Sequence, residues 1–223
     1  MSQMLILLPD RNRPGKSDFT GAFQPESRLL VEMRGGATVY IDQSNPDRLR
    51  RRQVVNAIDK HQPSEIVYFG HGLERRLPQL GFSLGHCAQL AEAIAEYATA
   101  PTVVLYACSA ADGVGPGGDG GFADVLRDSL CEAGAKGCVV WAHDRAGHTT
   151  GNRYVRQFWG PEPAVGGKWL FEPQGPHWKD WYCCDHMGPG FRGCPGKGAH
   201  GPLRLRFPWL DKDTLLRELR HGR

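Results

Sequence analysis

A histidine and a cysteine, each placed after a short apolar run, are the residues of this chain best suited to do chemistry. Residues 65–70 (Glu-Ile-Val-Tyr-Phe-Gly) lead into His71 and Gly72, and residues 102–107 (Thr-Val-Val-Leu-Tyr-Ala) lead into Cys108. Both runs have the length and the β-branched and aromatic content of buried strands. Because the carboxyl ends of neighbouring parallel strands meet at one edge of a sheet, we expect the two side chains to lie together. A histidine can activate a neighbouring thiol, so the pattern predicts a cysteine-nucleophile hydrolase.

The remaining elements must place these two strands in one parallel sheet. Further strands are predicted over β-branched and aliphatic runs at residues 4–8, 37–41 and 137–142. Helices are predicted after Asn45, as the cap of a helix with Pro46 at its first position, and over residues 84–97, 122–133 and 213–220. The helix over 84–97 lies between the two reactive residues and provides the crossover that a parallel pair requires. The sequence does not decide the secondary structure of two segments. Residues 26–33 fit a helix or a short strand, and residues 151–159 fit a strand or a helix.

Length and composition favour one main domain with a short extension. The chain has 223 residues, of which 40% are hydrophobic and 23% charged, and this is enough for one substantial core. Alternating strand and helix signals over residues 1–159 predict an α/β domain with a mostly parallel sheet. Residues 160–223 are dense in Gly, Pro, Trp, Cys and His, and they predict an irregular C-terminal extension packed on or beside that domain.

The distribution of charge argues against a nucleic-acid binder. Residues 1–159 carry 17 Lys and Arg against 17 Asp and Glu, whereas residues 160–223 carry 10 against 7, which together give the net charge of +3. A nucleic-acid binder usually presents a basic face that neutralises several phosphates. The one dense basic run, Arg48 with 50–52, is interpreted as the solvated face of a helix.

Cysteine usage and hydropathy indicate the cellular compartment in which the protein is expected. No stretch approaches the roughly 18 to 20 apolar residues that a membrane span needs, and residues 5–8 are too few for the core of a signal peptide. The seven cysteines are an odd number and are scattered along the chain, which does not resemble a paired disulfide framework. We therefore expect a soluble cytoplasmic protein that contacts no membrane.

The two strand-terminal blocks resemble a known superfamily. The segments Tyr-Phe-Gly-His-Gly (68–72) and Leu-Tyr-Ala-Cys-Ser (105–109), with a helix between them and a strand over 137–142 after them, look like the histidine and cysteine blocks of caspase-like peptidases. This superfamily contains caspases, metacaspases, gingipains, separases and bacterial CHAT-domain peptidases, and the match covers about residues 37–150. The resemblance implies a caspase-like three-layer sandwich, with a mostly parallel sheet and helices on both faces.

The resemblance also implies a mechanism for cleaving peptide bonds. Cys108 attacks a carbonyl to give a thioester acyl-enzyme, and His71 protonates the leaving amine. Gly72 has no side chain, so its N–H can approach the developing oxyanion, with the Cys108 N–H as second donor. We expect a Cys-His dyad that needs no cofactor and acts on protein or peptide substrates. Members of the superfamily often work inside larger assemblies, so an activating protein partner is a further expectation.

Acidic residues near the reactive edge provide candidates for substrate selection. Asp112 follows the candidate nucleophile and Asp144 follows the next predicted strand, while Asp119 lies in the Gly-rich loop between. We favour Asp112 and Asp144 as a pocket for a basic side chain, with cleavage after Arg or Lys. Loop aspartates also commonly cap turns or face water, which is the competing interpretation.

Other interpretations of the reactive residues remain open. Cys108 would be inert if it were simply a buried thiol, and the chain would then be a catalytically inert caspase-like domain that binds proteins. Packing explains Cys87, Cys131 and Cys138, which fall within or beside predicted helices and strands. A third class is a metal- or nucleic-acid-associated module. It would use the basic run 48–52 and four tail residues of the types that bind zinc, Cys183, His186, Cys194 and His200. The favoured interpretation of that tail is instead an irregular cover rich in aromatic residues.

Overall fold

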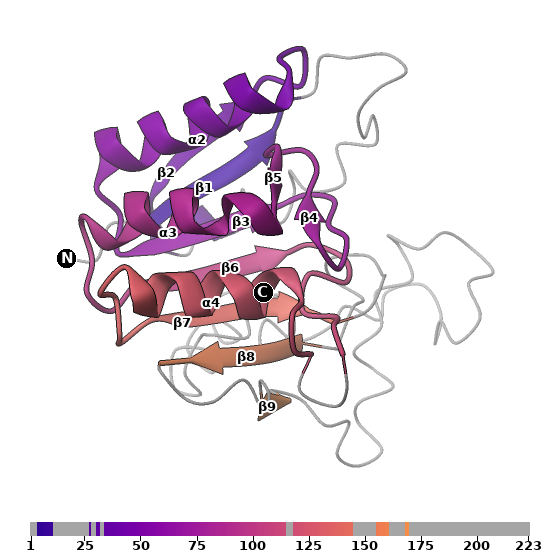
Figure 1. Cartoon of the computed structure of the whole chain (residues 1–223). Coiled ribbons are helices and arrows are strands. Elements are labelled where there is room, and N and C mark those ends of the chain that lie inside the picture. The colour runs from indigo at the N-terminus through magenta and orange to yellow at the C-terminus, as the bar shows by residue number, and fades with distance from the viewer. Residues whose placement is uncertain are drawn as a thin grey trace, which may run out of the picture.

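A seven-stranded sheet forms the centre of the part of the chain that the structure describes (Figure 1). The computed structural model describes residues 4–10, 27, 30–31, 34–114, 118–144, 155–160 and 168–169. In sheet order, the strands are β2 (Ala37–Ile41), β1 (Met4–Pro9), β3 (Glu65–Phe69), β6 (Thr102–Tyr106), β7 (Val139–His143), β8 (Val155–Trp159) and β9 (Lys168–Trp169). The first five are parallel to one another, and β8 and β9 each pair antiparallel to the preceding strand.

Three helices cover one face of this sheet and lie next to one another (Figure 1). They are α2 (Asp47–His61), α3 (Cys87–Ala95) and α4 (Phe122–Glu132), and a short 3-10 turn, η1 (Leu84–His86), leads into α3. A hairpin of β4 (Arg76–Leu77) and β5 (Phe82–Ser83) stands at the carboxyl end of the parallel strands. The prediction of an α/β domain with a mostly parallel sheet is confirmed.

Alternation along each strand gives the sheet two apolar faces, because successive side chains of a strand point to opposite sides. In β1, Leu5 and Leu7 belong to the core beneath the three helices, whereas Ile6 and Leu8 belong to a second core on the opposite face. That second core includes Leu30, which is helical. Apolar layers on both faces, with helical residues on each, are compatible with a three-layer sandwich.

Most predicted elements lie where the sequence places them, with local differences. Segment 151–159, for which the sequence allowed a strand or a helix, contains the strand β8. In and next to segment 26–33, for which it allowed a helix or a short strand, the described residues 27, 30, 31 and 34 are helical. The predicted crossover helix is instead a 3-10 turn followed by the shorter α3. The strand β9 continues the sheet beyond residue 159, so part of the predicted extension pairs with the main domain. The predicted helix over 213–220 lies outside the described residues.

The prediction that Asn45 caps α2 is wrong. Pro46 is the N-cap residue, and its extended backbone (φ −65°, ψ 159°) makes no side-chain hydrogen bond to the helix. The Asn45 amide instead donates to the Asp42 carboxylate at 3.2 Å, and that carboxylate also accepts from the Ser44 N–H at 2.7 Å. A local turn organised by Asp42 therefore competes for the side chain that would have capped the helix.

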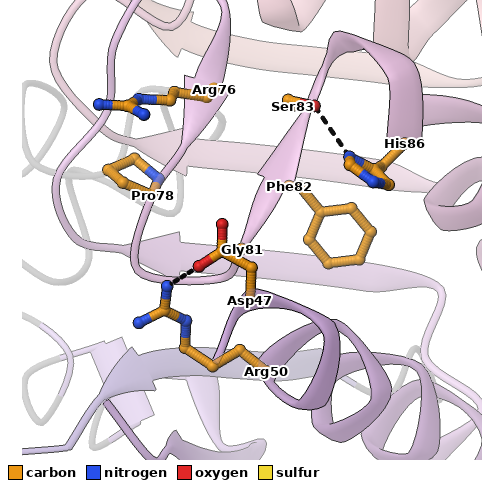
Figure 2. Close-up of a pocket in the computed structure, with 8 residues that line it drawn as sticks. All are labelled: Asp47, Arg50, Arg76, Pro78, Gly81, Phe82, Ser83 and His86. Atoms are coloured by element: carbon orange, nitrogen blue, oxygen red, sulfur yellow. Dashed lines mark hydrogen bonds and ion pairs between the residues drawn. The ribbon is translucent and has the colours of Figure 1, made fainter. Parts of the chain in front are cut away.

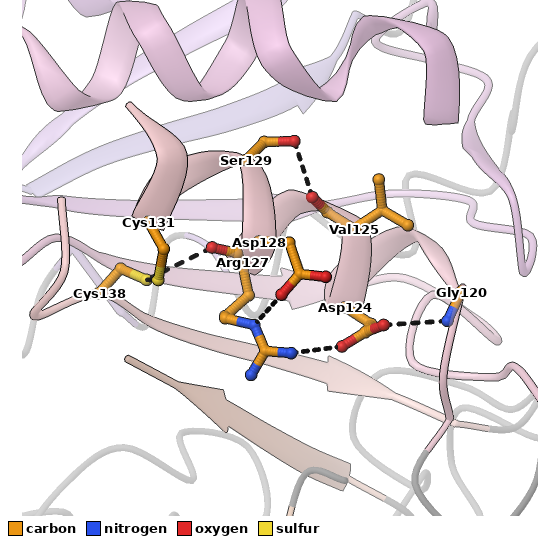
Figure 3. A network of polar contacts seen from close by, with 8 residues as sticks. All are labelled: Gly120, Asp124, Val125, Arg127, Asp128, Ser129, Cys131 and Cys138. Atoms are coloured by element: carbon orange, nitrogen blue, oxygen red, sulfur yellow. Dashed lines mark hydrogen bonds and ion pairs between the residues drawn. The ribbon is translucent and has the colours of Figure 1, made fainter. Parts of the chain in front are cut away.

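A buried ion-pair network joins α4 to the loop before it (Figure 3). Arg127 and Asp124 are each 3% exposed and form an ion pair at 2.7 Å, and Arg127 also contacts the exposed Asp128 at 2.7 Å. The second oxygen of Asp124 accepts a hydrogen bond from the Gly120 N–H at 2.9 Å. Arg127 thus provides the charge that compensates a carboxylate removed from water.

Candidate active site

The histidine and cysteine blocks follow neighbouring strands at the same edge of the sheet. Phe69, the last residue of β3, is paired in register with Tyr106, the last residue of β6. His71 and Cys108 each lie two residues beyond that pair. The pairing continues past the strand ends, because the Gly70 N–H donates to the Tyr106 carbonyl oxygen at 3.2 Å. The parallel register therefore brings the two backbone segments together, although 37 positions separate the residues in sequence.

Gly72 packs directly against the cysteine segment. A Cβ atom at this position would lie 2.6 Å from the Ala107 Cβ and 2.7 Å from the Cys108 carbonyl oxygen. Real Cβ atoms essentially never approach other atoms this closely. Residue 72 must therefore be glycine for the two segments to keep this spacing. The buried Gly72 backbone, the exposed His71 and the half-buried Cys108 form the edge of the candidate site.

The residue after the cysteine has an unusual backbone conformation. Ser109 has φ 55°, in the left-handed region, and it lies in a tight turn over residues 108–111. The turn is closed by the Asp112 N–H, which donates to the Ser109 carbonyl oxygen at 3.0 Å. A non-glycine residue in this region costs free energy, and such strain is concentrated at functional sites. The turn ends β6 abruptly and leaves Cys108 partly accessible at the sheet edge.

Two buried side chains hold the backbone of His71. The Tyr68 hydroxyl donates to the His71 carbonyl oxygen at 2.9 Å, and the Gln79 Oε1 accepts from the His71 N–H at 2.7 Å. The Tyr68 hydroxyl also lies 3.2 Å from Gln79 Oε1. Burial raises the pKa of Tyr68 well above its usual value, and only partial compensation comes from the positive charge of Arg50. The phenol consequently stays protonated at neutral pH and remains a donor to His71.

These holding residues were not singled out by the sequence. Tyr68 is an aromatic residue in an apolar strand, where a packing role is the normal interpretation, and Gln79 lies in the hairpin without a recognisable motif. A second glutamine extends the arrangement, because Gln43 Nε2 donates to the Gln79 carbonyl oxygen at 2.9 Å. Among the residues that the structure describes, the buried Gln79 Nε2 has no hydrogen-bond partner. The position of His71 therefore depends on side chains from β3 and the hairpin.

Replacing Tyr68 with phenylalanine is expected to loosen His71. The Tyr68→Phe variant loses the hydrogen bond to the His71 carbonyl, which should lower the free energy of unfolding by about 1 kcal/mol. Alkylation of Cys108 should slow severalfold if His71 assists the thiol. Chemical denaturation and labelling kinetics measure the two effects. Tyr40→Phe, at a tyrosine that is 50% exposed on β2, is the matched control, and equal effects of the two changes would contradict the positioning role.

The acidic candidates occupy different environments around the site. Asp112 is exposed, and its carboxylate accepts a hydrogen bond from the Gly113 N–H at 3.0 Å. Asp144 is 6% exposed at the end of β7, and its carboxylate is paired with the Arg156 guanidinium at 3.4 Å. Asp119 is half-buried in the Gly-rich loop. A basic substrate side chain would therefore compete with Arg156 for Asp144, whereas Asp112 is accessible.

The cysteines near the core differ from Cys108 in their surroundings. Cys87 is fully buried, and burial raises the pKa of its thiol to about 12. Burial, together with the neighbouring Cys131 thiol at 3.8 Å, raises the pKa of Cys138 to about 12 as well. These environments agree with the packing roles expected from the sequence.

Alkylation should separate these thiols from Cys108. A thiol with a pKa near 12 is ionised to only about one part in ten thousand at pH 8, and the thiolate is the reactive form. Iodoacetamide at pH 8 is expected to modify Cys108 in the folded protein and to spare Cys87 and Cys138 until denaturant is added. Peptide mapping by mass spectrometry reads out each position. Modification of Cys87 at the same rate as Cys108 in native buffer would contradict the assignment.

The described part of the chain contains no cluster of metal-ligand side chains and no membrane-spanning helix. Within the described residues, no group of three or more His, Cys, Asp or Glu side chains could hold a metal ion. The four tail residues considered for zinc, Cys183, His186, Cys194 and His200, lie outside the described residues. No helix in the described ranges is long and apolar enough to cross a membrane.

Two comparisons with known proteins found no match to this chain. No protein-family model matches the chain, and the search of curated proteins found no match. The resemblance of the two sequence blocks to caspase-like peptidases therefore stays a prediction.

Proposed function

We propose that the protein is a cysteine endopeptidase of the caspase-like type, with Cys108 as nucleophile and His71 as its partner. The observation that carries the proposal is the parallel register of β3 and β6, which sets both residues two positions beyond one aligned pair. The helix α3 between these strands, the turn after Cys108 and the sheet with apolar layers on both faces also fit a caspase-like domain.

The chemistry follows from the groups at this edge. The Cys108 sulfur attacks the carbonyl carbon of the scissile peptide bond, and the thiol proton passes to the His71 imidazole. The tetrahedral oxyanion accepts hydrogen bonds from the N–H groups of Gly72 and Cys108. His71 then protonates the leaving amine, the C–N bond breaks, and a thioester remains on Cys108. Water, deprotonated by His71, attacks the thioester and releases the carboxylate product and the free thiol.

Cleavage after a basic residue is the proposed specificity. Asp112 is the accessible carboxylate beside the turn that bears Cys108, and Asp119 lies in the same loop. Asp144 can contribute only if a substrate cation replaces Arg156 as its partner. Peptides with Arg or Lys before the scissile bond should be cut and matched peptides with Asp should not. Cleavage of the Asp peptides alone would overturn this specificity.

A peptide with a thiol-reactive electrophile at its carboxyl end tests the enzyme directly. Such a probe, with Arg before the electrophile, should label Cys108 once per chain, and His71→Ala should slow the labelling at least about a hundredfold. His61→Ala, at a histidine in the last turn of α2, is the matched control and should leave the rate unchanged. A labelling rate that is unaffected by His71→Ala would contradict the assignment of Cys108 and His71 as a catalytic dyad. An inert Cys108 in a folded protein would favour a caspase-like domain that only binds proteins.

A further inference from the structure

A pocket separate from the candidate dyad lies between the start of α2 and the β4–β5 hairpin (Figure 2). Its volume is about 280 Å³, just below the range of about 300–1,000 Å³ that is typical of small-molecule sites. Figure 2 shows α2 residues on one side and hairpin and η1 residues on the other. The lining residues that matter below are Asp47, Arg50, Arg76, Phe82 and His86.

The charged lining of this pocket consists of two arginines and one aspartate, so it is positive on balance. Arg50, from the second turn of α2, is largely buried, with a side chain 15% exposed, and Arg76 of β4 is exposed at the opposite wall. His86 is held by a 2.8 Å hydrogen bond between its Nδ1 and the Ser83 hydroxyl. Phe82, 1% exposed, supplies an apolar wall. Two guanidinium groups and an imidazole thus line one small cavity.

Arg50 is fixed in place but retains an unused donor. Its guanidinium forms an ion pair with Asp47 and lies 3.4 Å from the Gln43 side-chain oxygen. The buried Arg50 Nε has no hydrogen-bond partner in the part of the chain that the structure describes. The guanidinium as a whole lines the cavity, and a guanidinium forms strong charge-assisted hydrogen bonds with an oxyanion that has several acceptor oxygens. The Asp47 side chain is 66% exposed, so it can move aside for a ligand.

The surroundings add positive charge to the pocket. Arg51 donates to the Gly81 carbonyl oxygen in the pocket wall at 2.7 Å. The two segments that contribute Asp47, Arg50 and Arg76 to the pocket, residues 47–52 and 74–76, together contain six arginines against two acidic residues, Asp47 and Glu74. This excess concentrates anions near the cavity. Arg50 belongs to the basic run at residues 48–52 and Arg76 lies far from it in sequence, and only the fold brings the two arginines to one pocket.

We propose that this pocket binds the phosphate group of a small molecule. A phosphate carries close to two negative charges at neutral pH and offers three acceptor oxygens, which suits two arginines and a histidine better than a singly charged carboxylate does. The cavity admits the phosphate and a small attached group, which would contact Phe82. The site does not depend on the proposed peptidase activity, since none of its lining residues belongs to the dyad.

Titration calorimetry with inorganic phosphate tests the proposal on the full chain, at constant ionic strength set with sodium chloride. Saturable binding at one site is expected. Arg76→Gln should weaken it at least about tenfold, because one charge-assisted contact is lost. Arg52→Gln, on the exposed side of α2 and outside the pocket, is the matched control and should change the affinity less than about twofold. Arg76 is exposed, so its replacement should leave the fold intact.

The outcomes separate the alternatives. Absence of saturable binding, or equal weakening by Arg76→Gln and Arg52→Gln, would overturn the site. Acetate binding as tightly as phosphate would overturn the assignment to phosphate. Glycerol phosphate binding more tightly than inorganic phosphate would support a phosphate ester as the ligand, and equal binding would support free phosphate. The titration is repeated with Cys108→Ser, and unchanged affinity there shows that the site stands whether or not the chain is a peptidase.

Discussion

Gly72→Ala is expected to lower the rate of peptide cleavage by about a hundredfold or more and to destabilise the folded protein. The new methyl group would stand 2.6 Å from the Ala107 Cβ and 2.7 Å from the Cys108 carbonyl oxygen. Because part of this contact is backbone, the two segments must separate. Separation moves the Gly72 N–H away from the proposed oxyanion position, and loss of one such donor costs about 10²–10³ in rate. The overpacking should reduce the free energy of unfolding by about 1–3 kcal/mol.

The same peptide substrate and chemical denaturation measure both effects. Gly85→Ala is the matched control, since a Cβ there meets nothing within 4 Å and the backbone is not in the left-handed region. It should alter neither quantity appreciably. A Gly72→Ala enzyme with unchanged cleavage rate would remove Gly72 from the proposed oxyanion site. A reduced rate with an unchanged free energy of unfolding would show that the segments tolerate the methyl group and that the effect is confined to catalysis.

Arg127→Ala is expected to reduce the free energy of unfolding by about 3–5 kcal/mol at neutral pH. The change leaves the Asp124 carboxylate, 3% exposed, without its ion-pair partner in the interior (Figure 3). When one member of a buried ion pair is removed, the desolvation cost of the remaining charge is no longer compensated. Burial already raises the pKa of Asp124, while the Gly120 N–H and the charge of Arg127 oppose that rise. Without Arg127, the pKa of Asp124 should rise further.

The sign of this pKa change predicts how the loss depends on pH. A carboxyl group whose pKa is higher in the folded state than in the unfolded state favours folding at low pH, and that contribution disappears as pH rises through the folded pKa. The gap in stability between wild type and Arg127→Ala should therefore be largest at neutral pH and shrink toward pH 4. Denaturation curves at several pH values measure it. Asp128→Ala, at a side chain 51% exposed, should cost no more than about 0.5 kcal/mol. A gap independent of pH would contradict the role of Asp124.

The sequence was enough to place His71 and Cys108 relative to their strands. The runs that became β3 and β6 are short, apolar and rich in β-branched and aromatic residues, and both His71 and Cys108 follow them closely. Apolar spacing between them indicated a helix, which provides the crossover connection that a parallel strand pair requires. Local patterns of this kind depend on residues close in sequence, so they can be read before the fold is known. The parallel sheet and the position of the two blocks at its carboxyl edge follow from them.

Only the tertiary structure decided which distant side chains support or modify that edge. Tyr68 and Gln79 meet at the His71 backbone because the β4–β5 hairpin stands at the carboxyl end of β3, and Asp144 pairs with Arg156 through the antiparallel pairing of β7 with β8. Arg50 and Arg76 likewise reach one cavity from separate elements. These contacts join residues far apart in sequence, and their partners are fixed by strand order, register and packing. The periodicity of a single segment contains none of that information, which is why the sequence could predict where His71 and Cys108 lie relative to their strands but not the side chains around them.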